Sequence, residues 1–73
     1  MSSGFLLLET VPGREGHVLD LLARVPGVTQ RSVVFPAAIA VKVESDGGID
    51  PLARELGRID GVLSARVYRA RNT

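Results

Sequence analysis

The sequence predicts an α+β fold in which the element order βαββαβ builds one four-stranded antiparallel sheet. Three observations lead to this prediction. A motif occurs twice, as LARVPGV in residues 22–28 and as LGRIDGV in residues 56–62, at a spacing of 34 residues that also relates Val33 to Val67. Each copy reads as a helix end, a turn that contains glycine and the start of a strand, which indicates two similar halves. Short apolar segments flank two stretches with helical periodicity.

The first half contains a strand, a helix and a second strand. Residues 5–11 are apolar at consecutive positions, which is typical of a strand that is covered on both faces. A Pro-Gly pair ends this strand, and we expect a helix from about residue 14 to residue 24. A second Pro-Gly pair ends the helix, because proline cannot continue it and glycine tolerates a left-handed cap. Residues 28–35 then read as the second strand. The apolar residues of the helix lie at helical spacing: Val18, Leu21, Leu22 and Val25.

The second half repeats this pattern. Residues 38–44 alternate in character, and the short connection before them predicts an antiparallel hairpin with the preceding strand. Asp50 is expected to cap the second helix, with Pro51 at its first position. Residues 62–69 form the last predicted strand, and a short tail follows. The buried stripe of the second helix is expected to contain Leu52, Ala53, Leu56 and Ile59. The residues expected to share one face of the last strand are Leu63, Ala65 and Val67.

This element order predicts the ferredoxin-like arrangement, of the dimeric αβ-barrel type, with both helices on one face of the sheet. We expect one domain over residues 1–73, with its core from about residue 5 to residue 69. The other face would expose apolar side chains, so we expect two copies to pack sheet to sheet. The candidate interface residues are Phe5, Leu6, Leu7, Leu8, Arg66 and Tyr68.

The composition is that of a small globular protein, with 45% hydrophobic residues. The chain contains no cysteine, so it has neither a disulfide framework nor a thiolate metal site. Nine basic and eight acidic residues give a net charge of +1, which is too balanced for a nucleic-acid footprint. No apolar run is long enough to span a membrane, and the first residues do not resemble a signal peptide. We therefore expect a cytoplasmic protein with neither nucleic acid nor a membrane as a direct partner.

The sequence contains no recognisable catalytic set, and we predict that the protein is not an enzyme. His17 is the only histidine and is expected on the solvent-facing side of the first helix, and the carboxylates form no acid/base pair. No catalytic, metal-binding or cofactor-binding residue is identified, and no cofactor is expected. The open sheet face is expected to lack the aromatic pair on which an RNA-binding sheet stacks bases, with Tyr68 as an edge-strand residue.

Several segments are similar to the C-terminal effector-binding domain of the leucine-responsive regulatory (Lrp/AsnC) transcription factors. They are LETVPGRE in residues 8–15, VPGV in residues 25–28 and IDGV in residues 59–62, and the similarity covers about residues 5–69. The chain begins at the first strand, so it resembles the stand-alone form of this domain without a helix-turn-helix. The resemblance implies a regulatory module that forms homodimers, in some cases octamers of four dimers, and can bind an amino acid or another small-molecule effector between subunits.

The chain departs from this family between the second and third strands. The family usually has a Gly-x-Tyr-Asp-like motif there, whereas this chain has FPAAI in residues 35–39, so no effector-pocket residue is assigned. A second resemblance, in residues 41–44 and 61–68, is to the periplasmic nitrate reductase assembly chaperone, which binds a signal peptide on its sheet. A small dimeric αβ-barrel enzyme is a third reading. The polar sheet residues that such an enzyme could use are Gln30, Ser32, Lys42, Ser64 and Arg66.

Overall fold

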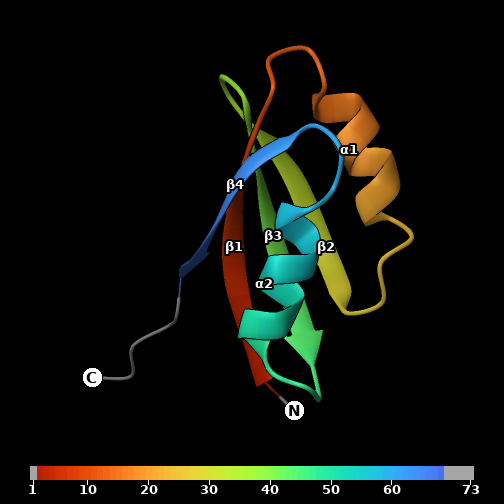
Figure 1. The fold of residues 1–73 in the computed structure, drawn as a ribbon, viewed down its shortest axis with the longest axis vertical. Coiled ribbons are helices and arrows are strands. Elements are labelled where there is room, and N and C mark those ends of the chain that lie inside the picture. Colours follow the sequence, from red (N-terminus) through yellow and green to blue (C-terminus); the bar gives the residue numbers. More distant parts are fainter. Residues whose placement is uncertain (1, 69–73) are drawn as a thin grey trace.

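The computed structural model describes residues 2–68, and these residues form the predicted order of four strands and two helices. The end of the last predicted strand at Arg69 and the predicted tail lie outside the described residues. Figure 1 shows the chain path from the N-terminal strand to the C-terminal strand. The elements are β1 (Ser2–Thr10), α1 (Glu15–Leu22), β2 (Val28–Val34), β3 (Ala38–Ser45), α2 (Ile49–Gly57) and β4 (Val62–Tyr68).

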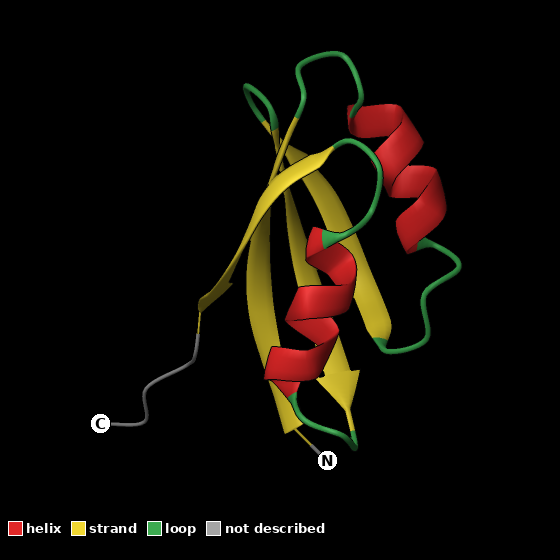
Figure 2. Ribbon diagram, in the orientation of Figure 1, coloured by secondary structure: helices red, strands yellow, loops and turns green. Residues whose placement is uncertain are grey.

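The four strands form one antiparallel sheet in the order β2-β3-β1-β4. The strands of the first half therefore pair with those of the second half at β1–β3, β2–β3 and β1–β4. Both helices lie on the same side of this sheet (Figure 2). These features confirm the predicted ferredoxin-like α+β fold, in which two right-handed βαβ crossovers place their helices together.

The core lies between the sheet and the two helices. Alternate side chains of a strand point to opposite faces, and the buried positions follow that period of two. Leu6 and Leu8 of β1 are buried at this side, whereas Phe5 is half exposed on the other side. The consecutive apolar residues of this strand therefore point alternately to the core and to the opposite face of the sheet. The apolar core residues of β3 and the helices are Val18, Leu22, Ile39, Val41, Val43, Ile49, Leu52, Ala53 and Leu56.

The second helix begins earlier than the sequence predicted. Its N-cap is Gly48, and Asp50 and Pro51 both lie inside the first turn, so the prediction of Asp50 as the cap is wrong. The earlier start brings Ile49 into the helix, where it is 8% exposed and packs over Gly4 of β1. Burial of this apolar side chain favours the longer helix, and proline is tolerated in a first turn because the first N–H groups have no helical partner.

The repeated motif folds in the same way in both halves. Gly27 and Gly61 each have a left-handed backbone conformation, with φ of 97° and 99°. The N–H of Val28 donates to the carbonyl of Val25 at 3.3 Å, and the N–H of Val62 donates to that of Ile59 at 3.0 Å. These turns point each following strand back along the sheet, which confirms that the sequence repeat is a structural one.

The repeat extends into a β-bulge at the start of each following strand. The register shifts between Val28 and Gln30 in β2, and between Val62 and Ser64 in β4. The extra residues are Thr29 and Leu63, at the same spacing of 34 as the turns. A bulge leaves one residue out of the alternation. Leu63 is therefore 65% exposed and does not share the core side with Ala65 and Val67, contrary to the sequence prediction.

Candidate functional site

The candidate functional site is the open face, which we define as the side of the sheet that the helices leave uncovered. Its side chains alternate with the core side chains along each strand, and strand register groups them into rows across the sheet. No segment of residues 2–68 covers this face as the helices cover the other (Figure 2). Its central residues are Phe5, Leu7, Glu9, Gln30, Ser32, Val34, Ala38, Ala40, Lys42, Glu44, Ser64, Arg66 and Tyr68.

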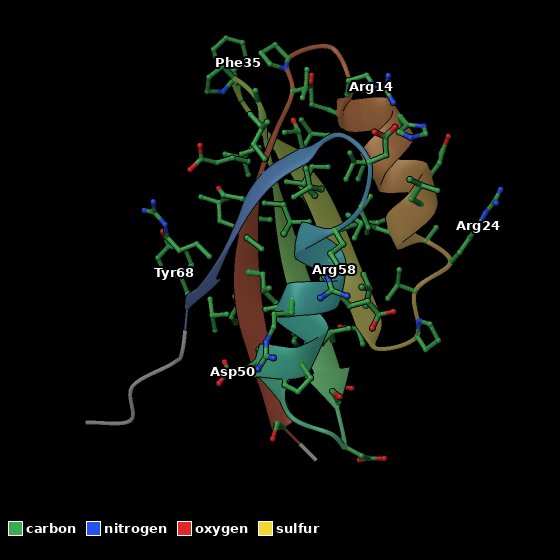
Figure 3. All side chains as sticks on the ribbon, viewed as in Figure 1. Arg14, Arg24, Phe35, Asp50, Arg58 and Tyr68 are labelled. Atoms are coloured by element: carbon green, nitrogen blue, oxygen red, sulfur yellow. The ribbon has the colours of Figure 1, made fainter. Side chains whose placement is uncertain are left out.

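One row of the open face places two aromatic rings next to a cation. Phe5 pairs with Tyr68 of β4 on one side and with Lys42 of β3 on the other, and Gln30 of β2 follows Lys42. Phe5 is 50% exposed and Tyr68 is 48% exposed. In Figure 3 the Tyr68 side chain points away from the helices. The expectation that the open face lacks an aromatic pair is therefore wrong, because strand order brings the two ends of the chain together.

The next two rows supply a small apolar centre and further charges. Leu7 pairs with Ala40 on one side and with Arg66 on the other, so a large side chain lies beside a small one. Arg66 Nη2 lies 4.0 Å from Glu9 Oε1 in an exposed ion pair. Lys42 makes no ion pair with any residue of the described chain. Together with Glu44, these side chains give the open face two cations and two anions, so its formal charge is zero.

The structure divides the six candidate interface residues between the two faces. Phe5, Leu7, Arg66 and Tyr68 lie on the open face, as an interface through it would require. The structure excludes the other two, because Leu6 is 1% exposed and Leu8 is 0% exposed beneath the helices. A run of apolar residues does not show which alternate positions face a core. For this reason all four residues of the run 5–8 were predicted to lie at the interface.

Sequence analysis considered Lys42 only among the polar residues that an enzyme could use and did not assign it to a ligand site. Lys42 is the only lysine of the chain, and its same-face neighbours on β3 are Ala40 and Glu44. A single lysine next to a small residue in this strand was the signal in the sequence that marks the position. All five polar residues considered for an enzyme lie on the open face: Gln30, Ser32, Lys42, Ser64 and Arg66.

A second polar cluster joins the start of α1 to the turn after α2. Arg14 Nη2 donates to Asp60 Oδ2 at 2.7 Å, and His17 Nε2 lies 3.5 Å from the same oxygen. Their side chains are exposed, so this cluster contributes about 0–1 kcal/mol to stability. His17 is on the surface, as expected, and lies beside Asp60 of the second repeat turn.

Three further features of the described residues bear on possible sites. Within residues 2–68, no three or more histidine and carboxylate side chains converge where they could hold a metal ion. Neither helix in this part of the chain has the length and apolarity needed to cross a bilayer. Among residues 2–68, the most exposed large apolar side chain is that of Phe35, which is 92% exposed at the end of the β2–β3 hairpin (Figure 3).

Comparison with protein-family models, curated proteins and solved structures gave no match for this chain.

Proposed function

We propose that this chain is a non-enzymatic regulatory module that forms a homodimer through its open face and senses a small molecule at the subunit interface. The observation that carries the proposal is the exposed pair Phe5–Tyr68 on an uncovered sheet face. Large aromatic side chains contribute much of the binding energy of protein interfaces. The resemblance of the sequence to the regulatory family supplies the functional class.

The charge pattern of the open face supports a second copy as the partner. A two-fold axis that runs parallel to the strands, between β3 and β1, would place β3 against β1 of the second copy and β2 against β4. Lys42 would then lie over Phe5 of the other copy, which is a favourable cation–π arrangement. In the same arrangement Arg66 faces Ser32. Like charges therefore do not meet. Because the formal charge of the face is zero, two copies do not repel each other when these faces come together.

The packing of small against large residues supports the same partner. The axis described above places Leu7 of one copy over Ala40 of the other, and Ala40 over Leu7. Both are partly buried in the single chain and lie in the row next to the aromatic pair. Large side chains that lie opposite small ones allow two sheets to approach each other closely, as the interfaces of stable homodimers do.

Sedimentation velocity of the purified chain at micromolar concentration tests the proposal. The wild-type chain is expected to sediment as a dimer or a larger oligomer of dimers, and Tyr68→Asp is expected to shift it toward the monomer. Phe35→Asp is the matched control, because it places the same charge on a more exposed aromatic position outside the central rows of the open face. A wild-type monomer, or equal effects of the two substitutions, would contradict the proposal.

A further inference from the structure

A shallow cavity opens on the open face beside Lys42. Its volume is about 110 Å³, well below the ~300–1,000 Å³ of sites for drug-sized molecules, so it suits a group of only a few heavy atoms. The small Ala40 side chain leaves room at its centre, and Phe5 forms an apolar wall. The polar residues that line it are Gln30, Arg31, Ser32 and Lys42. Arg31 pairs with the buried Val41, so strand alternation places its side chain on the helix side of the sheet and leaves Gln30, Ser32 and Lys42 on the open face.

Lys42 is a partly buried cation whose charge is not matched by an ion pair within residues 2–68. The other cation of the open face, Arg66, is matched by Glu9. Strand register places Gln30 directly beside Lys42, and Ser32 beside Ala40 in the next row. An ammonium, an amide N–H₂ and a hydroxyl therefore line the same cavity, and together they offer several hydrogen-bond donors to one acceptor group.

We propose that this cavity binds the carboxylate of a small organic acid. A carboxylate accepts hydrogen bonds at two oxygens and carries the charge that Lys42 lacks, and charge-assisted bonds of this kind are strong. The short apolar body of the acid would lie against Phe5 and Ala40, beneath Leu7 of the second copy. The inference rests on the proposed function, because a second copy packed on the open face closes the cavity and removes the ligand from water.

An NMR titration of the intact chain with sodium isobutyrate tests this site. Backbone amide signals of Gln30, Ser32 and Lys42 are expected to shift in a saturable way. Isobutyramide has the same shape but no charge. Its affinity is expected to be lower by a factor of about ten or more, because it loses a charge-assisted bond. Lys42→Met keeps the apolar stem and should weaken isobutyrate binding by a similar factor. Arg54→Met, which removes an exposed cation from α2, is the matched control and should bind as the wild type does.

Sedimentation of the same samples separates the two proposals. A dimer that shows no saturable shifts overturns the carboxylate site and leaves the proposed function standing. Equal binding of isobutyrate and isobutyramide, or unchanged binding by Lys42→Met, also overturns the site. A wild-type monomer overturns the proposed function and, with it, the closure of the cavity by a second copy, whatever the titration gives.

Discussion

Phe5 of β1 lies directly opposite Tyr68 of β4 on the open face, although the two residues come from opposite ends of the chain. The same row contains Lys42, so one line of side chains carries both the proposed dimer contact and the proposed carboxylate site. The two roles overlap at Lys42 and Phe5, which line the cavity and would also contact the second copy. Tyr68 does not line the cavity, so its substitution tests assembly alone, whereas Lys42→Met tests ligand binding with sedimentation of the same sample as its control.

Alanine at Gly27 is expected to destabilise the fold more than alanine at Gly61. Both positions have φ near 100°, which alone costs an L-residue about 1–2 kcal/mol. A Cβ at Gly27 would lie 2.7 Å from the backbone carbonyl oxygen of Glu44, whereas a Cβ at Gly61 would lie 3.0 Å from the side chain of Val18. The strand cannot move without losing the hydrogen bond from Glu44 N–H to Gly27 O, but a side chain can shift.

Urea denaturation of the two glycine variants measures this difference. Gly16→Ala is the control, because it lies in α1 with open space around it and should stabilise the fold by about 0.5–1 kcal/mol. A smaller loss of unfolding free energy for Gly27→Ala than for Gly61→Ala would show that the close approach of Gly27 to β3 is not a constraint on the turn.

Truncation of Leu8 and of Leu63 should differ strongly in cost. Leu8 is 0% exposed in the core, so Leu8→Ala should lower the unfolding free energy by about 2–5 kcal/mol. Leu63 is 65% exposed at its bulge, so Leu63→Ala should change it by no more than about 0.5 kcal/mol. Both are best measured in the Tyr68→Asp background, where assembly contributes least. Equal costs would mean that Leu63 follows the alternation of β4 and that the bulge is absent.

Removal of the Thr10 hydroxyl should stabilise the protein. Thr10 is 2% exposed, and its Oγ1 has no hydrogen-bond partner among the described residues. A buried polar group without a partner costs about 1–3 kcal/mol, so Thr10→Val should raise the unfolding free energy by about 1 kcal/mol. Thr29→Val is the opposite case, because Thr29 Oγ1 donates to the carbonyl of Lys42 at 3.2 Å. In thermal unfolding, the midpoint temperature should rise for Thr10→Val and fall for Thr29→Val. A lower midpoint for Thr10→Val would show that the Thr10 hydroxyl makes a stabilising hydrogen bond.

Local signals in the sequence predicted the elements and their order well. The Pro-Gly and Asp-Gly turns, the helical spacing of Val18 and Leu22, and the alternation of residues 38–44 each report on a few neighbouring residues. These signals are strong because a backbone that needs a left-handed turn or an apolar stripe restricts its residues directly. The errors occurred where a distant contact competes with a local signal. Burial of Ile49 over Gly4 moved the start of α2 away from Asp50.

By itself, the sequence determined the order of the elements, the two equivalent turns and the apolar character of β1. Only the tertiary structure decided which side of β1 is core, so that Leu6 and Leu8 lie beneath the helices while Phe5 stays half exposed. It alone placed Phe5 between Tyr68 and Lys42. The physical reason is that turn residues and apolar periodicity report on a few neighbouring residues. Which strands lie side by side depends instead on pairing between segments far apart in sequence, such as β1 and β4.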